Sequence, residues 1–460
     1  MLTSLRIRNF KPWQDTRPIR LAPLTVFFGP NSSGKSSLNQ FLLMLRQTAE
    51  SPDRRRVFHT GDLDTPVDLG SFRDLVFGHQ EEVEVSFSLT WKLGTSLRVE
   101  DLQHQRTFEG DRLTFEARVG ELGRELTVHE MRYALGLAGE TALRVGMRPE
   151  EGGSGRRYEV FSPEYTFARP VGKPKQIPPP VRFYGFPDEV VAYYQNAAFT
   201  SDLVLALERL LTGISYLGPL RDLPRRVYPW AGDSPEHVGW KGERSIEAIL
   251  SARDRLVSPG PHGRNKPFAE VIARWLQIMG LIESFNVRPI GERGRLNEVV
   301  VRTPASPEDV LLTDVGFGVS QVLPVVVQCF YAPPGSTIIL EQPEIHLHPA
   351  VQSSLADLFI EAIRAREGGL DRGVQIIVES HSEHFLRRLQ RRIAEGLEPN
   401  LAALYFCEAG RAGSRIRELD LDLYGNIRNW PENFFGDPME DVALQTEAGL
   451  ERMIANEPEA

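Results

Sequence analysis

The chain has 460 residues, of which 41% are hydrophobic and 25% are charged, and these proportions are ordinary for a globular protein with a large core. They exclude a disordered chain, a collagen and a coiled-coil rod. The two cysteines, Cys329 and Cys407, cannot form a disulfide framework, and no run of about 18 uncharged apolar residues could span a membrane, so we expect a cytoplasmic protein.

The first 48 residues predict strands, a tight loop and a helix, in that order. Apolar and polar residues alternate from Leu5 onward, and an apolar run at residues 24–28 ends at Gly29. Apolar residues then recur at helical spacing over residues 34–48. The junction at residues 29–36 reads Gly-Pro-Asn-Ser-Ser-Gly-Lys-Ser, which fits the pattern G-x-x-x-x-G-K-[ST] in its required strand-to-helix context.

This junction, the phosphate loop, is typical of a site that binds a nucleoside triphosphate. Its glycines let backbone N–H groups wrap a phosphate chain at a helix N-terminus, where the helix dipole favours an anion. Lys35 would reach the β- and γ-phosphates, Ser36 would bind Mg²⁺, and Ser37 could hydrogen-bond a phosphate. The predicted nucleotide-binding residues here are Gly29, Asn31, Ser33, Gly34, Lys35, Ser36 and Ser37.

The rest of the chain changes its pattern twice. Residues 83–170 predict short strands and turns, and residues 200–285 predict mostly helix. From residue 311 onward strands and helices alternate, which indicates a largely parallel sheet with helical crossovers. The expected elements there are helices at 318–330, 350–366 and 382–395 and strands at 336–341, 374–379, 402–407 and 415–421.

Polar residues follow two of these predicted strands. One strand ends in Glu341, with Gln342 and Glu344 close behind, and the next leads into His381. A glycine-rich segment at residues 314–321 precedes the first of the helices. An ATP-hydrolysing site needs a carboxylate for the metal and a group that positions water, and these strand ends could supply both.

The order and spacing of these motifs resemble those of ABC-type ATPases. The opening residues Leu5–Lys11 and the segment Leu347–Pro349 are similar to the soluble SMC/RecF/OLD-like branch rather than to transporter subunits. Residues 216–221, 341–344 and 429–435 resemble a prokaryotic AAA family. Its chains end in a domain of unknown function, and the ATPase of the Septu anti-phage system is a relative.

The resemblance implies an α/β fold, namely an ABC-type P-loop ATPase head. Such a head has a mixed sheet with flanking helices and an antiparallel β lobe, and here it would carry a mainly helical insertion. The expected segments are residues 1–200 (first half of the head, with the phosphate loop and β lobe), 201–310 (helical insertion), 311–430 (second half) and 431–460 (acidic tail). The tail holds eight acidic residues and one arginine, so it carries most of the net charge of -9.

The resemblance also implies roles for the strand-end residues. Glu341 matches the Walker B carboxylate, which would hold Mg²⁺ together with Ser36. His381 matches the switch histidine near the γ-phosphate. The position after the Walker B acid usually holds a glutamate that orients the attacking water, but here it is Gln342.

This departure bears on the rate of hydrolysis. A glutamine amide can hydrogen-bond water but cannot accept its proton, and general base catalysis is worth about 10²–10⁴-fold. Either hydrolysis is slow, or Glu344 or His381 supplies the missing base. The predicted catalytic residues are therefore Glu341, Gln342, Glu344 and His381.

Further residues would serve the nucleotide from other parts of the chain. By the same resemblance, Gly316, Gly318 and Ser320 match the signature loop, which contacts the ATP held by a second subunit. This implies a homodimer or a higher even oligomer with composite ATP sites. Lys11 could help hold the nucleotide, and Gln80 is a candidate for the Q-loop glutamine.

Three functions are open at this stage. The first is an ATP-gated dimeric switch, slow in hydrolysis, that controls a separate effector such as a nuclease in anti-phage defence. The second is a non-hydrolysing ATP-sensing scaffold for a partner nuclease, and the third is a RecF-like DNA-binding repair ATPase. Arg387, Arg388, Arg391 and Arg392 would form a basic stripe on one helix, either for DNA or an acidic partner or as a solvated face with local acids. No membrane partner is expected.

Overall fold

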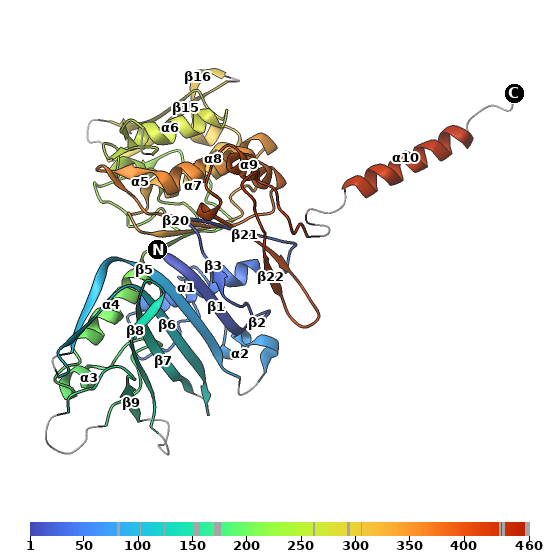
Figure 1. Ribbon diagram of the computed structural model, residues 1–460. Coiled ribbons are helices and arrows are strands. Elements are labelled where there is room, and N and C mark those ends of the chain that lie inside the picture. The colour runs from blue at the N-terminus through green and yellow to red at the C-terminus, as the bar shows by residue number, and fades with distance from the viewer. Residues whose placement is uncertain are drawn as a thin grey trace.

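Two large sheets and the helices around them form the body of the molecule (Figure 1). The structure is a computed structural model, and the residues that it describes are 1–80, 83–101, 103–123, 125–150, 157–169, 176–260, 263–291, 295–304, 306–431, 434 and 438–455. The phosphate loop directly follows β4, which belongs to one of these sheets, whereas β1 belongs to the other.

The central sheet has six strands in the order β10-β17-β20-β4-β21-β22. The first five are parallel, and β22 pairs antiparallel with β21. Every residue of β4, β17 and β20 is buried, as expected for parallel strands that are covered on both faces. The strands are β4 (Leu24–Phe28), β10 (Ile214–Leu217), β17 (Thr337–Glu341), β20 (Gln375–Glu379), β21 (Ala402–Glu408) and β22 (Arg415–Glu418).

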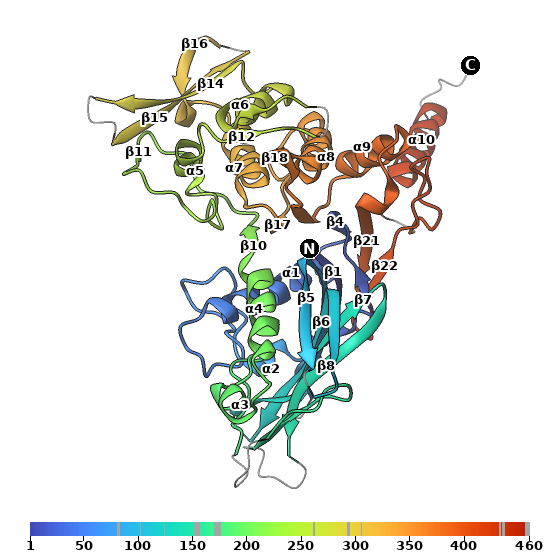
Figure 2. The same cartoon turned by 60° about the vertical axis from the view of Figure 1, so that its left-hand side comes forward.

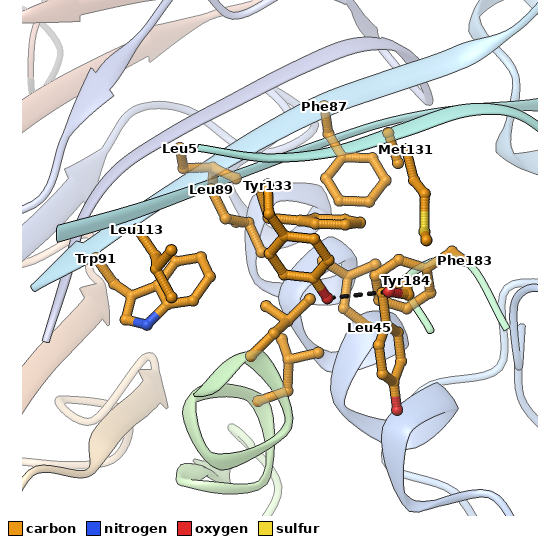
Figure 3. Close-up of a cluster of buried hydrophobic side chains, with 14 of the residues drawn as sticks. Leu5, Leu45, Phe87, Leu89, Trp91, Leu113, Met131, Tyr133, Phe183 and Tyr184 are labelled. Atoms are coloured by element: carbon orange, nitrogen blue, oxygen red, sulfur yellow. Dashed lines mark hydrogen bonds between the residues drawn. The ribbon is translucent and has the colours of Figure 1, made fainter. Parts of the chain in front are cut away.

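An antiparallel lobe of eight strands lies beside the central sheet, in the order β2-β1-β5-β6-β7-β8-β9 with β3 paired to β1. Its inner face packs aromatic and aliphatic side chains against α1, and the hydroxyl of Tyr133 donates to the carbonyl of Tyr184 at 3.0 Å within this core (Figure 3). The strands are β1 (Leu2–Phe10), β2 (Trp13–Asp15), β3 (Ile19–Arg20), β5 (Val85–Asp101), β6 (Arg106–Leu122), β7 (Glu125–Leu137), β8 (Glu140–Pro149) and β9 (Tyr158–Phe161).

Helices cover both faces of the central sheet and create two separate cores. Along β4, Phe27 packs into the core shared with α1, α4 and the antiparallel lobe, whereas Leu24, Val26 and Phe28 pack into the core under α5 to α9. Figure 2 shows α4 beside the antiparallel lobe and α7, α8 and α9 on the other side of the central sheet. The helices are α1 (Lys35–Glu50), α2 (Phe72–Leu75), α3 (Asp188–Tyr193), α4 (Phe199–Thr212), α5 (Ser245–Ser251), α6 (Phe268–Ile278), α7 (Phe317–Tyr331), α8 (Pro349–Arg364), α9 (Glu383–Ala394) and α10 (Pro438–Ala455), with 3-10 turns at Phe77–His79, Leu312–Asp314 and Pro399–Leu401.

The alternation predicted after residue 311 is present, with α7, β17, α8, β20 and α9 following one another along the chain. The phosphate loop likewise stands between a buried strand, β4, and a helix, α1. The tail contains α10, which Figure 1 shows standing away from the body. Within the described part of the chain, no helix is both long and apolar enough to cross a membrane.

The expectation of a mainly helical insertion at residues 201–310 is wrong. This segment holds most of α4 together with α5 and α6, but also strands β10 to β16, and β10 is itself an edge strand of the central sheet. A separate four-stranded sheet, β11-β15-β14 with β16 on β15, forms between residues 228 and 311. The β-branched run Val299–Val301 favours a strand, and its pairing with residues 285–287 depends on contacts that helical spacing does not reveal. The remaining strands are β11 (Tyr228–Pro229), β12 (Leu256–Val257), β13 (Lys266–Pro267), β14 (Ser284–Ile290), β15 (Leu296–Thr303), β16 (Ser306–Leu311), β18 (Arg366–Glu367) and β19 (Leu370–Asp371).

Candidate ATP-binding and catalytic site

The phosphate loop has a backbone that other residues could not easily adopt. Gly29 has φ 140° and Gly34 has φ 92°, both in the region that favours glycine. A Cβ atom on Gly29 would lie 2.2 Å from the carbonyl oxygen of Cys407, and one on Gly34 would lie 2.9 Å from the Pro12 ring. The Trp13 indole, from β2, donates to the Ser37 hydroxyl at 2.8 Å and so ties the loop to the antiparallel lobe.

Lys35 folds back over the loop that carries it. Its ammonium group donates to the carbonyl oxygens of Gly29 at 3.0 Å and Pro30 at 2.8 Å, and it lies 3.9 Å from the carboxylate of Glu379. Burial lowers the pKa of Lys35, and Glu379 opposes that shift. The Ser33 hydroxyl is fully buried with no hydrogen-bond partner among the described residues. A buried polar group normally has such a partner, and a phosphate oxygen would supply one.

Two other predicted residues of the phosphate loop, Asn31 and Ser37, differ from Ser33 in exposure or in hydrogen bonding. Asn31 is exposed at the outer edge of the loop. The Ser37 hydroxyl is already engaged, because it donates to the carbonyl of Gly34 at 2.6 Å and accepts from Trp13. In this state Ser37 braces the loop, and a hydrogen bond from its hydroxyl to phosphate would require these contacts to change.

Two buried carboxylates stand side by side at the carboxyl ends of neighbouring strands. Glu341 ends β17 and Glu379 ends β20, and the two residues are direct partners in the register of the sheet. Glu379 accepts a hydrogen bond from the Ser36 hydroxyl at 3.1 Å. Glu341 accepts from Asn39 of α1 at 3.3 Å and from the hydroxyl of Tyr216, on β10, at 3.1 Å.

Glu379 was not among the residues predicted from the sequence, although its position resembles that of Glu341. Like Glu341, it is an acid at the last position of an apolar strand that reads as buried, directly before a segment with a predicted catalytic residue. Asn39 and Tyr216 were also missed, because only their contacts with Glu341 reveal a role at this site.

The surroundings shift the pKa of both carboxyl groups above its ordinary value. Burial, and then the charge of Glu379, raise the pKa of Glu341 to about 7. Burial also raises the pKa of Glu379, while Lys35 opposes the shift. The Oε2 atom of Glu379 is buried without a hydrogen-bond partner among the described residues. Two carboxylates and the hydroxyl of Ser36 are hard oxygen donors of the kind that Mg²⁺ prefers, so the residues present fit Mg²⁺.

Glu344 and His381 meet just beyond these strand ends. One carboxylate oxygen of Glu344 accepts from the Ser380 hydroxyl at 2.9 Å and from the backbone N–H of His381 at 2.6 Å. The other oxygen, and Nε2 of His381, are buried without a partner among the described residues. Burial raises the pKa of Glu344, whereas burial and then Lys35 lower the pKa of His381. A carboxyl group with a raised pKa beside a neutral imidazole suits proton transfer near neutral pH.

Gln342 has a constrained backbone. Its φ of 44° lies in the left-handed region, which a residue other than glycine rarely adopts, and its N–H donates to the carbonyl of Glu379 at 2.9 Å. Such conformations cost free energy and cluster at functional sites. The turn therefore fixes where the Gln342 side chain leaves the backbone between Glu341 and Glu344.

The predicted signature residues lie at the start of α7, apart from the phosphate loop of the same chain. Gly316 is exposed with open space around it, Gly318 is partly exposed, and the buried Ser320 donates to the carbonyl of Phe317 at 2.8 Å. Among the described residues, no hydrogen bond or ion pair joins residues 314–320 to residues 29–37. The signature glycines thus face solvent rather than the chain's own phosphate loop.

The structure places Lys11 close to the phosphate loop, but it does not connect Gln80 with the site. The ammonium group of Lys11 donates to Gln40 of α1 at 2.9 Å, and Pro12 and Trp13 next to it contact Gly34, so Lys11 lies close to the phosphate loop. Gln80 is exposed at the end of a 3-10 turn, and no contact of the described residues joins it to the site. Its assignment to the Q-loop therefore stays a prediction without structural support.

The basic stripe on α9 is paired with acids of the same chain. Arg387 and Arg391 bond the carboxylates of Glu383 and Glu395, each four residues away on the helix. Arg388 and Arg392 share the carboxylate of Asp357 on α8, at 2.7 and 2.6 Å. Of the two alternatives for the stripe, these pairs agree with a solvated face whose arginines bond local acids.

A phosphate loop after the parallel strand β4, two carboxylates at the ends of β20 and β17, and an antiparallel lobe against the first helix are the features of an α/β P-loop ATPase fold. A family model of an AAA ATPase domain matches residues 1–100, and one described as an AAA domain, putative AbiEii toxin, Type IV TA system matches residues 298–387. Residues 1–100 and 298–387 are therefore similar to AAA ATPase domains. A further model, of a protein of unknown function (DUF3696), matches residues 397–445.

Solved structures similar to the chain include three heads of SMC proteins. The SMC head domain from Thermotoga maritima is 12% identical with a TM-score of 0.39, over 91% of this chain and 99% of that one. An SmcHead bound to the C-winged helix domain of ScpA is 11% identical with a TM-score of 0.41, over 92% and 98%. The Smc head domain with an extended coiled coil, bound to the C-terminal domain of ScpA from Pyrococcus furiosus, is 10% identical with a TM-score of 0.37, over 91% and 96%. No curated protein matches the chain.

Proposed function

We propose that this ATPase is a dimeric switch that is gated by ATP, hydrolyses it slowly and controls a separate protein effector in anti-phage defence. The observation that carries the proposal is the combination of Gln342 beside Glu341 with a buried carboxylate, Glu344, two residues further along. Such a site can bind ATP and hold the attacking water, but the bases near it, Glu344 and His381, stand outside the usual position.

Each residue of the site has a role in this proposal. The phosphate loop and Lys35 bind the β- and γ-phosphates, while Ser36, Glu341 and Glu379 hold Mg²⁺, which when bound offsets phosphate charge. Gln342 orients a water molecule, and Glu344 accepts its proton. The water oxygen forms a bond to the γ-phosphorus as the bond to the bridging oxygen breaks, and the electron pair of that bond leaves with ADP.

Slow turnover follows from the identity of the residue at position 342. Loss of a well-placed general base costs about 10²–10⁴-fold in rate. Glu344 retains part of that catalysis, because its raised pKa makes it a stronger base than an exposed carboxylate once it is ionised. His381, with Nε2 free and a neutral ring, would hydrogen-bond the γ-phosphate or the water.

Dimerisation completes the site in this proposal. Among the described residues, the glycines at the start of α7 have no hydrogen bond to the phosphate loop of their own chain, and a second copy related by twofold symmetry would present its ATP to them. A defence role is supported by the description of the model that matches residues 298–387, which names a putative toxin of a toxin–antitoxin system. The effector is a separate protein, for example a nuclease.

Single-turnover hydrolysis of radiolabelled ATP tests the proposal. Wild type should turn over well below the median enzyme rate of roughly 10 s⁻¹. Gln342→Glu should be faster, because it places a carboxylate where the water is held, and Glu344→Gln should bind ATP but lose the residual activity. Fast turnover in wild type would contradict the slow switch. Tight ATP binding with no hydrolysis in any variant would instead favour a sensing scaffold.

A further inference from the structure

Arg221 is a buried cation without a counterpart. It follows β10 by four residues and is only 7% exposed, and none of its three guanidinium nitrogens has a hydrogen bond or ion pair with any described residue. Burial lowers its pKa to about 10, so it stays charged at neutral pH. An isolated buried charge costs several kcal/mol unless a partner compensates it, and a guanidinium has five N–H donors to satisfy.

The region around Arg221 belongs to the ATP site. Arg221 follows the carboxyl end of β10, where Leu217 pairs with Leu340, the residue before Glu341, and where the Tyr216 hydroxyl donates to Glu341. Glu344 is the carboxylate whose charge acts most on Arg221. The free oxygen of Glu344 and the free Nε2 of His381 are also buried and unpaired. Arg221, Glu344 and His381, which follow β10, β17 and β20, thus each have a polar atom without a hydrogen-bond partner among the described residues.

The loop that carries Arg221 is anchored on both sides. The N–H of Gly218 donates to the carbonyl of Trp240 at 2.8 Å, and the N–H of Asp222 donates to the carbonyl of Lys241 at 2.9 Å. Further along, Arg226 bonds Asp314, at the start of the signature segment, at 2.9 Å. The backbone on both sides of Arg221 is therefore held in place before any ligand arrives, and the side chain is buried, which favours the preorganisation that electrostatic catalysis requires.

We propose that Arg221 is a catalytic residue that binds the γ-phosphoryl oxygens of ATP in its own chain. The inference rests on the proposed function and adds a second cation to the γ-phosphate besides Lys35. A planar guanidinium matches phosphoryl oxygens with two parallel hydrogen bonds, which satisfies donors that the protein leaves empty. Charge on those oxygens is greatest as the phosphoryl group transfers, and an arginine at this place in other ATPases and GTPases is worth about 10³–10⁵-fold in rate.

A purely structural role for Arg221 would have different consequences. If the arginine only neutralised Glu344, removing both charges together would restore what removing one had lost. If it binds phosphate, neutralising Glu344 cannot replace it. Arg225 is the matched control, because it lies in the same loop but is exposed and pairs only with Asp222.

The test compares Arg221→Met, Arg221→Lys, Arg225→Met and the double variant Arg221→Met/Glu344→Gln with wild type. ATP affinity and the affinity for ADP with aluminium fluoride, a mimic of the transferring phosphoryl group, are measured by calorimetry, with single-turnover rates in parallel. Arg221→Met should lose at least about 100-fold in rate and in affinity for the mimic, and much less in affinity for ATP. Arg221→Lys should recover part of both, and Arg225→Met should match wild type.

Two results would overturn the inference. One is wild-type affinity for the mimic in Arg221→Met, and the other is its recovery in the double variant. Melting temperatures identify any variant that fails to fold, and Arg221→Lys then carries the test because it keeps the charge. Failure of wild type itself to bind ATP would contradict the proposed function, whereas normal wild-type hydrolysis with unaffected Arg221 variants would contradict only this inference.

Discussion

The charge of Glu341 should make the nucleotide-free protein less stable as the pH rises. Burial, and then Glu379, raise the pKa of Glu341 from its ordinary 4.5 to about 7. Below pH 4.5 the group is protonated in both the folded and the unfolded chain, so it has no effect on the pH dependence there. Between the two values the folded protein keeps a proton that the unfolded chain releases, and the free energy of unfolding therefore falls with pH.

The size of this effect follows from the pKa. Each pH unit in the window corresponds to roughly 1.4 kcal/mol, so Glu341 should account for a loss of about 3 kcal/mol by pH 7 and little more above it. Glu344 and Glu379 also have raised pKa values and act in the same direction, so the total change in wild type will be larger. The contribution of Glu341 has to be obtained as a difference between two proteins.

Urea unfolding from about pH 4 to about pH 8, in wild type and Glu341→Gln, measures that difference. The variant should lack about 3 kcal/mol of the pH dependence. Glu379→Gln should also reduce the pH dependence, because it removes a carboxyl group with a raised pKa and one of the causes of the shift at Glu341. Added Mg²⁺ should flatten the wild-type profile, because a cation favours the ionised carboxylates. Equal pH dependence in wild type and Glu341→Gln would refute the reasoning.

Three further outcomes are expected. Lys35→Ala should abolish ATP binding in calorimetry with little change in melting temperature, and wild-type affinity would contradict the phosphate loop. Ser320→Arg should block ATP-dependent dimerisation in light scattering without weakening the first ATP bound; a variant that dimerises normally would remove the signature loop from the interface. Gly29→Ala should lower the melting temperature and ATP affinity, because its Cβ would meet the carbonyl of Cys407 at 2.2 Å, and an unchanged melting temperature would show that the loop can shift.

The sequence was sufficient for those parts of the site that are local in the chain. The phosphate loop needs only a strand, a glycine pattern and a helix, and the structure has them at β4 and α1. Strands at 337–341 and 375–379 could be predicted because continuous apolar runs between helices favour a parallel sheet. A motif of this kind can be predicted because the strand and the helix that position it are its direct neighbours in the sequence.

The parts that could not be predicted depend on long-range pairing. The sheet at residues 228–311 forms from antiparallel partners whose individual sequences are short and mixed, so a helical insertion was the wrong expectation. Arg221 could not be singled out from the sequence, because no pattern distinguishes a buried arginine from an exposed neighbour such as Arg225, four residues away. The burial of Arg221 comes from tertiary packing, which the sequence pattern does not reveal.

Strand order explains why Glu379, rather than Glu341, bonds Ser36. In the order β17-β20-β4, the strand of Glu379 lies between the Walker B strand and the strand that leads into the phosphate loop. Its carboxylate is therefore one strand closer to Ser36, while Glu341 is reached from α1 by Asn39 and from β10 by Tyr216. Ser36, Glu379 and Glu341 are accordingly the residues that would hold Mg²⁺, with Glu379 already bonded to the serine and Glu341 oriented by its two donors. A motif search that assigns the metal to Glu341 alone would miss the residue that already touches the phosphate-loop serine.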